Sequence, residues 1–261
     1  MAIKAGVGLS KNKDSYQAGY EACKLALEKA GLEKPDLTIA FASSSFHQDE
    51  LVRGIRDASG KAPLSGCTDA GEITNDGPTQ KAVGVLAIKA DNIKFFTGVG
   101  ENIKKGAQEA GQAVARDIKN KADKAKESLR AFIMFPDVLT GNGADVVRGI
   151  QDVLGVNFPV LGGAAGDDFL FKQTFQYNDD EAATGTVGGI GLSGSFTMGA
   201  GVRHGWIPIG VPMKVTKSEG AVIHTLDNRP AISIYADYFG QKAEELRKEP
   251  LARTPLISSI I

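Results

Sequence analysis

Two short segments combine glycines with carboxylates in a pattern suited to binding a small molecule. The first is Gly66–Glu72 and the second is Gly162–Asp168, and each follows an apolar stretch that we expect to be a strand. Glycines let a ligand approach the main chain, and carboxylates can hold an ammonium group. The alternative interpretation is structural, with the glycines in tight turns and the acids bonded to backbone amides. The acids in the two segments are Asp69, Glu72, Asp167 and Asp168.

Two polar segments that precede predicted helices offer free backbone amides. Ser43–Ser45 and Thr140–Gly143 each lie between a predicted strand and a predicted helix start. Amides at a helix N-terminus attract anions such as a carboxylate, so we expect Ser44 and Ser45 to contribute to ligand binding. Simple capping of the helix is the alternative.

The segment Arg203–Trp206 is the densest cluster of side chains of the kind used in recognition. Arg203 can grip a carboxylate in a bidentate fork, and Trp206 offers an apolar wall beside His204. A purely structural role between two halves of the molecule is the alternative for this cluster.

Cys67 is the one candidate for covalent chemistry. A nucleophilic cysteine needs a lowered pKa and usually a neighbouring histidine, and His47 and His204 are the plausible partners. We favour a ligand-binding role for Cys67 over catalysis, and we expect Cys23 to lie in the core.

Oxygen ligands for a hard cation are also present, since Asp167 and Asp168 can join Asp69 or Glu72. No histidine and cysteine spacing is typical of zinc. We therefore expect no metal site and no cofactor.

The composition favours a globular protein of the cytoplasm. The chain has 261 residues, 42% of them hydrophobic, and a formal charge of −1. Positive residues are interleaved with acids rather than gathered in a block, so we expect no nucleic-acid partner. No apolar run is long enough to span a bilayer, and the N-terminus lacks the apolar core of a signal peptide. Two cysteines do not make a disulfide framework.

Alternating strand and helix patterns position these candidates. Asp14 and Gly31 bound a first amphipathic helix, and strands are expected on either side of it. Two strand pairs are expected to be hairpins, 83–88 with 93–99 and 187–193 with 196–202. The remaining expected strands are 3–8, 37–42, 62–66, 158–161 and 171–177, and further helices follow residues 48, 106 and 143.

The chain reads as two copies of one unit, about residues 4–96 and 97–205. Gly6-Val7-Gly8 returns as Gly98-Val99-Gly100 after 92 positions, and Val52–Ile55 returns unchanged as Val147–Ile150 after 95. Such a tandem copy predicts two similar halves about a pseudo-twofold axis, with their loops facing a shared cleft.

A different pattern follows residue 205. Met213–Thr216 and Val222–Leu226 predict a hairpin that turns at Glu219-Gly220, and Asn228 with Pro230 predicts a helix start. We therefore expect a closing hairpin and helix over 206–240. Residues 241–261 are expected to be a linker or the start of a further domain.

Several of these stretches together resemble the N-terminal domain of the FIST family of bacterial sensory proteins. They are Gly66–Ile73, Gly162–Asp168, His204–Gly210 and the segment from Val215 to Ala231. The resemblance covers about residues 4–240 and implies a domain that senses small molecules such as amino acids and signals to an output protein. Family members usually carry a small hydroxyl residue where this chain has Asp69, which bears on ligand preference. They also continue into a second, C-terminal FIST domain.

We therefore expect an α/β fold of two tandem repeated halves with mixed sheets, followed by a terminal hairpin and helix. Residues 1–240 would form a FIST N-type sensory domain that binds a small molecule, an amino acid or small carboxylate, in a cleft between the halves. A hydrolase or transferase that uses Cys67 or the carboxylates is the alternative. The expected ligand-binding residues are Ser44, Ser45, Gly66, Cys67, Thr68, Asp69, Gly162, Gly163, Asp167, Asp168, Arg203, His204 and Trp206.

Overall fold

The structure is a computed structural model that describes residues 3–202, 207–208, 210–220, 222–234 and 237. The chain divides into two compact units, Met1–Gly201 and Val202–Ile261, and each is described by itself. Within the described residues, no helix is long and apolar enough to cross a membrane. The expected linker over 241–261 lies outside the described residues.

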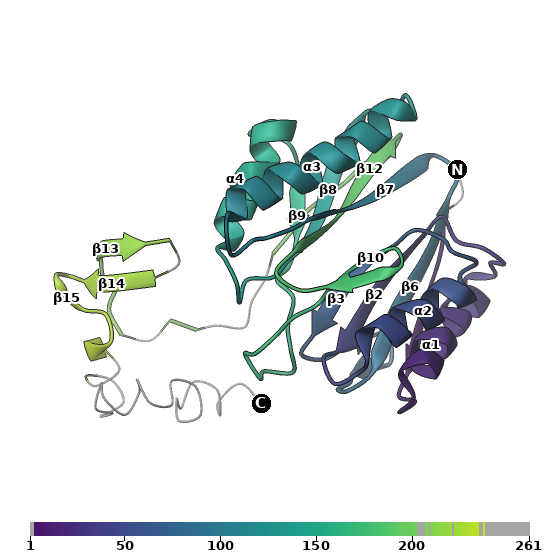
Figure 1. Cartoon of the computed structure of the whole chain (residues 1–261), viewed down its shortest axis with the longest axis horizontal. Coiled ribbons are helices and arrows are strands. Elements are labelled where there is room, and N and C mark those ends of the chain that lie inside the picture. Colours follow the sequence, from purple (N-terminus) through teal and green to yellow (C-terminus); the bar gives the residue numbers. More distant parts are fainter. Residues whose placement is uncertain (1–2, 203–206, 209, 221, 235–236, 238–261) are drawn as a thin grey trace. The chain divides into compact units, whose positions relative to one another are not determined.

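The first unit holds two sheets, each with a pair of helices on its outer face (Figure 1). The elements of the first sheet and its helices are β1 (Ile3–Ser10), α1 (Ser15–Ala30), β2 (Leu37–Ser43), α2 (Gln48–Ala58), β3 (Leu64–Asp69) and β6 (Val83–Ala90). Between β3 and β6 lies the small hairpin of β4 (Ile73–Thr74) and β5 (Gly77–Pro78). The elements of the second sheet and its helices are β7 (Ile93–Gly100), α3 (Ala107–Lys124), β8 (Leu129–Pro136), α4 (Gly143–Leu154), β9 (Val160–Gly162) and β12 (Val187–Gly194).

The two sheets have the same strand order. The first runs β1-β6-β2-β3 and the second runs β7-β12-β8-β9. Strand β6 in the first sheet and strand β12 in the second are antiparallel to both of their neighbours. The pairs β2–β3 and β8–β9 are parallel. The predicted α/β class with mixed sheets is therefore confirmed. The chain passes between the sheets at residues 91–92, a few positions before the expected boundary.

Three apolar clusters hold these layers together. One lies between the first sheet and α1 and α2, a second between the other sheet and α3 and α4, and a third between the two sheets. The third cluster includes Ile39, Cys67, Phe135 and Ile190. Because the inner faces of both sheets are apolar, they pack on each other and leave their outer faces to the helices.

Local signals at the first helix act as predicted. The Asp14 carboxylate accepts a hydrogen bond from the Gln17 N–H at 2.8 Å, and Gly31 ends the helix with a φ of 62°. This left-handed conformation suits glycine, which has no Cβ to clash.

Both predicted hairpins of the first unit are wrong. Strands β6 and β7 follow one another in the chain but belong to different sheets. The turn between them therefore carries the chain from the first sheet to the second. Strand β12 pairs with β7 and β8, and the structure has no strand at 196–202. A partner distant in sequence replaced the adjacent one in each case, which the local turn pattern does not reveal.

An arm of the second half, residues 163–186, crosses to the first sheet and returns. It contributes β10 (Gln176–Asn178), which pairs antiparallel with β3, and β11 (Glu181–Ala183) at the sheet edge. The predicted strand 171–177 is thus shorter and later. Its first part is instead a tight loop, with positive φ values at Phe169 and Phe171.

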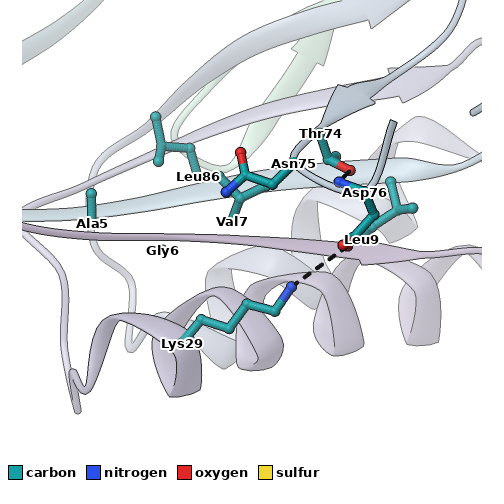
Figure 2. A pocket seen from close by; sticks show the side chains of 9 residues that line it. All are labelled: Ala5, Gly6, Val7, Leu9, Lys29, Thr74, Asn75, Asp76 and Leu86. Carbon is teal, nitrogen blue, oxygen red and sulfur yellow. Dashed lines mark hydrogen bonds and ion pairs between the residues drawn. The ribbon is translucent and has the colours of Figure 1, made fainter. Parts of the chain in front are cut away.

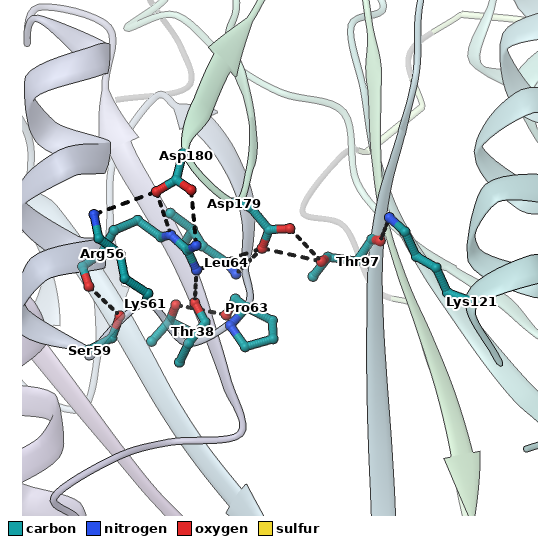
Figure 3. A network of polar contacts seen from close by, with 11 residues as sticks. Thr38, Arg56, Ser59, Lys61, Pro63, Leu64, Thr97, Lys121, Asp179 and Asp180 are labelled. Carbon is teal, nitrogen blue, oxygen red and sulfur yellow. Dashed lines mark hydrogen bonds and ion pairs between the residues drawn. The ribbon is translucent and has the colours of Figure 1, made fainter. Parts of the chain in front are cut away.

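Buried Arg56 on α2 holds the tip of this arm (Figure 3). Its guanidinium donates to both carboxylate oxygens of Asp180, at 2.9 and 3.1 Å, and to the Ala62 carbonyl. The hydrogen bonds from Arg56 lower the pKa of the Asp180 carboxyl. Neighbouring Asp179 accepts the Leu64 N–H at 3.1 Å and faces Thr97 of the second sheet, so the arm tip contacts both halves.

The second unit contains a small sheet of β13 (Val215–Glu219), β14 (Val222–Leu226) and β15 (Arg229–Pro230). The predicted hairpin is confirmed, with Gly220 at its turn. Asn228 is not a helix cap, because it has a φ of 63° and leads directly into β15.

Gly66 and Gly162 occupy equivalent places in the two parallel strand pairs. They are in register with Ala40 and Met134, and their φ values are 146° and 138°. A Cβ at either position would lie 1.9 to 2.0 Å from the partner's carbonyl oxygen. Glycine is therefore required for the strands to approach.

We predict that Gly162→Ala destabilises the first unit by about 3 kcal/mol or more, because it adds both a clash and backbone strain. Gly163→Ala is the matched control, since its Cβ would meet nothing within 4 Å, and we expect a change under about 0.5 kcal/mol. Urea unfolding measures both. Equal losses in the two variants would contradict this role of Gly162.

Candidate functional site

The two glycine-acid segments lie side by side. Gly166 N–H donates to the Thr68 carbonyl at 2.9 Å, and Asp168 N–H donates to the Asp69 carbonyl at 3.0 Å. On the other side, Gly163 and Ala165 N–H groups bond to Met134 and Pro136 of β8. The start of the arm therefore spans from the second sheet to the carboxyl end of β3, where side chains leave the packed layers.

Asp168 binds the serine segment that follows β2. Its Oδ2 atom accepts hydrogen bonds from the Ser43 and Ser44 hydroxyls at 2.9 and 2.7 Å, and from the Ser44 N–H at 2.9 Å. The residue holds a φ of 55°, which this set of bonds to a charged group stabilises. Ser45 is exposed, and its hydroxyl contacts that of Ser43 at 2.7 Å. The serines thus bind the arm rather than cap α2, whose N-cap residue is His47.

Buried Asp167 has a structural role. Its carboxylate accepts the N–H groups of Phe171, Lys172 and Gln173 at 2.6 to 3.1 Å. These bonds shape the tight loop of the arm and leave Asp167 with little capacity for a ligand. The capping interpretation also holds at Asn142, whose side chain accepts the Ala144 N–H at the start of α4.

Asp69 accepts fewer hydrogen bonds from N–H and O–H donors than the other acids of the site, with only the Gly71 N–H at 3.3 Å among the described residues. Its pKa is raised to about 7, first by burial and then by the negative charges of Glu72 and Asp168. The hydrogen bond from the Gly71 N–H opposes this shift. Among the residues that the structure describes, no cation forms an ion pair with Asp69. Within the described residues, no positive side chain therefore offsets the burial of this carboxyl.

Glu72 and Phe41 belong to the same region, although neither was among the expected ligand-binding residues. Glu72 is buried, and its carboxylate accepts the Thr79 hydroxyl and the Ala82 N–H, both at 3.1 Å. Phe41 is 37% exposed and packs edge-to-face on Phe135 of the other sheet, with ring centroids 5.6 Å apart. For Phe41 the signal is strand register, since Phe41 pairs with Cys67, two positions before Asp69. Glu72 is signalled by sequence alone, three positions after Asp69.

Cys67 lies in the apolar cluster between the sheets with 3% of its surface exposed. Burial raises the pKa of its thiol, and Asp69 raises it further. A thiol that resists ionisation is a poor nucleophile. Its environment therefore argues against Cys67 as a nucleophile and against direct contact of Cys67 with a ligand.

The other expected residues divide into three groups. Gly66 and Gly162 let neighbouring strands of their own sheets approach, and the Thr68 hydroxyl accepts the Phe175 N–H of the arm at 3.0 Å. Gly163 is exposed with open space around it. Arg203, His204 and Trp206 lie outside the described residues. In the described part of the chain, no group of three or more His, Cys, Asp or Glu side chains is arranged to hold a metal ion.

Comparison with known proteins identifies a family that this chain matches. Residues 36–229 match the family model described as FIST N domain. Among curated proteins, an uncharacterised protein of Methanocaldococcus jannaschii is 27% identical over 242 residues, covering 88% of this chain and 44% of that protein. An uncharacterised protein of Mycobacterium tuberculosis is 25% identical over 236 residues, covering 88% and 58%. The chain spans about half the length of these relatives.

Two solved structures of cyanuric acid hydrolase also align with this chain. One, from A. caulinodans, has a TM-score of 0.38 and 12% identity, and covers 72% of this chain and 71% of its own. The other has a TM-score of 0.39 and 10% identity, and covers 74% and 69%. No inference about activity follows from likeness at this level.

Asp69 makes stability depend on pH in a defined direction. Its pKa is about 7 in the folded chain and about 3.9 in an unfolded one. The folded state therefore binds the proton more tightly, and stability is lost as the pH rises from about 4 to 7. We predict that Asp69→Asn removes this loss, so that the variant equals the wild type near pH 4.5 and exceeds it by about 2 kcal/mol at pH 8.

Urea unfolding at the two pH values measures this difference. Glu33→Gln, a change at an exposed acid, serves as the control and should leave the pH dependence unchanged. A variant Asp69→Asn with the same pH dependence as the wild type would show that Asp69 is ionised throughout.

Proposed function

The chain belongs to the FIST N domain family, a family of small-molecule-sensing domains in signal transduction, and we propose that it binds a small molecule through an ammonium group at Asp69. Amino acids are the leading class. The site would lie where Gly66–Glu72 meets the start of the arm, so that both halves of the first unit contribute to it.

The observation that carries this proposal is the partly buried carboxyl of Asp69, which accepts one N–H hydrogen bond and pairs with no cation of the described residues. A partly buried acid whose pKa is raised to about 7 lowers stability at neutral pH, and a bound cation would reverse that cost. The carboxylates of Glu72 and Asp168 add negative potential at the same place, since both raise the pKa of Asp69. Their own hydrogen bonds keep them fixed, which leaves Asp69 as the acceptor for a ligand.

Phe41 supports a ligand that also has an apolar part. Its ring is partly exposed on the strand next to β3, and its contact with Phe135 joins the two sheets at this point. An aromatic face near a carboxylate favours an organic cation, because the ring attracts the positive charge while covering apolar atoms.

Binding at this position would also give a route to signalling. Asp69 belongs to β3 and Asp168 to the arm, so a ligand between them favours one arrangement of the halves over another. We infer that the change is passed to an output protein or to a further, C-terminal FIST domain in the cytoplasm. The greater length of the curated relatives is in keeping with such a partner.

A thermal-shift screen with amino acids and small amines at pH 8 tests the proposal. At a ligand concentration tenfold above Kd, binding adds about 1.4 kcal/mol, which corresponds to about 3 °C for a unit of this size. We expect Asp69→Asn to abolish the shift and Glu33→Gln to retain it. If every compound leaves the wild type unchanged, or if the shift persists in Asp69→Asn, the assignment of this site is wrong.

The affinity of a hit should fall at low pH. The ligand needs the ionised carboxylate, and the pKa of Asp69 is about 7, so each pH unit below that value should weaken binding about tenfold. Isothermal titration between pH 5 and 8 measures this slope. An affinity that does not vary over that range would place the cation elsewhere.

A further inference from the structure

A separate cavity lies on the inner face of the first sheet, at its free edge. It has a volume of about 260 Å³ (Figure 2). Strand β1 is the last strand of this sheet and pairs only with β6. The lining residues are Ala5, Gly6, Val7, Leu9, Lys29, Thr74, Asn75, Asp76 and Leu86.

The floor of the cavity is apolar. Ala5, Val7 and Leu9 alternate along β1 on the side away from α1, and Leu86 of β6 stands beside them (Figure 2). Glycines occupy the other face, where a Cβ at Gly6 would lie 2.2 Å from the Ala26 carbonyl oxygen of α1. The close approach of α1 keeps the strand in place and fixes its larger side chains on the cavity side.

The β4–β5 hairpin forms a polar roof. Thr74, Asn75 and Asp76 come from its tip, and the Thr74 hydroxyl accepts the Asp76 N–H at 3.3 Å. At the base of the hairpin, Glu72 and Thr79 exchange backbone hydrogen bonds at 3.1 and 2.8 Å. The hairpin that covers the cavity is therefore held by its own hydrogen bonds.

Lys29 reaches from α1 past the edge of β1 to this roof (Figure 2). Its Nζ atom lies 3.9 Å from the Asp76 carboxylate, and the two side chains are 49% and 77% exposed. An exposed ion pair of this length contributes little. Asp76 stands at the solvent-facing tip. The Lys29 ammonium can therefore leave it and pair with a ligand carboxylate that enters the cavity.

We propose that this cavity binds a small aliphatic carboxylate. The hydrocarbon part lies on the floor of Ala5, Val7, Leu9 and Leu86, and the carboxylate accepts hydrogen bonds from the Lys29 ammonium and the Asn75 amide. Because Lys29 and Asn75 offer hydrogen-bond donors at the mouth, we expect the ligand to carry a negative charge. The ligand class and the residues differ from those at Asp69. A negative result for one of the two proposed sites therefore leaves the other proposal unchanged.

The test is a titration of the full chain with hexanoate, followed by NMR of the methyl groups of Val7, Leu9 and Leu86. We expect saturable shifts at these methyls. Lys29→Met, which keeps the hydrocarbon stem and removes the charge, should weaken binding about tenfold or more. Lys13→Met is the matched control at another exposed lysine and should bind as the wild type does.

Two further ligands and one variant complete the design. Hexanol has the same chain without the charge, so it should bind more weakly and be insensitive to Lys29→Met. Asp69→Asn should bind hexanoate normally. The proposal is overturned if hexanoate gives no saturable shift, if Lys29→Met leaves its affinity unchanged, or if hexylammonium binds more tightly than hexanoate.

Discussion

The hydrogen bonds that tie the arm to the end of β3 are the constraint on which the site depends. The N–H groups of Gly166 and Asp168 bond to the carbonyls of Thr68 and Asp69, and the Asp168 carboxylate gathers the serine hydroxyls that follow β2. The pairing of β10 with β3 and the contacts of Asp179 and Asp180 also join the halves, but they lie away from the end of β3. With the hydrogen bonds at that end, a segment of the second half covers the end of the first and withdraws Asp69 from water. The raised pKa of Asp69 is thus a product of how the halves are joined.

Much of this arrangement could be predicted from local signals. Asp14 and Gly31 mark the ends of α1, and the two glycine-acid segments lie at the carboxyl ends of the parallel strands β3 and β9. Strand β3 runs to Asp69, however, beyond the expected end at residue 66. Predictions were wrong where pairing depends on distant residues. Turn residues between β6 and β7 are typical of a hairpin, yet only the apolar inner faces of the two sheets decide that these strands part. The short β10 and the loop before it depend on Asp167, whose role is visible only when its three backbone partners are in place.

The candidate site shows the same division. Residue types alone point to Asp69, Asp167 and Asp168 as equivalent acids, but the structure separates them by their partners. Asp167 holds backbone amides and Asp168 holds the serine segment. Asp69 accepts the Gly71 N–H, and a hydrogen bond with the Glu72 carboxyl contributes to its raised pKa. A carboxylate can bind a ligand only with the oxygen lone pairs that the hydrogen bonds of the protein leave free. The departure from the small hydroxyl residue expected in the family therefore falls at the acid of this site that accepts the fewest hydrogen bonds from N–H and O–H donors among the described residues.

Glu72 links two regions that are otherwise independent. Its side chain bonds to Thr79 and Ala82 and so closes the β4–β5 hairpin, while its charge acts on Asp69. Any displacement of the hairpin moves a charge that sets the proton affinity of a neighbouring acid. Such coupling is reciprocal in free energy, so a neutral Asp69 would favour the hairpin position that holds the Glu72 carboxylate close to it.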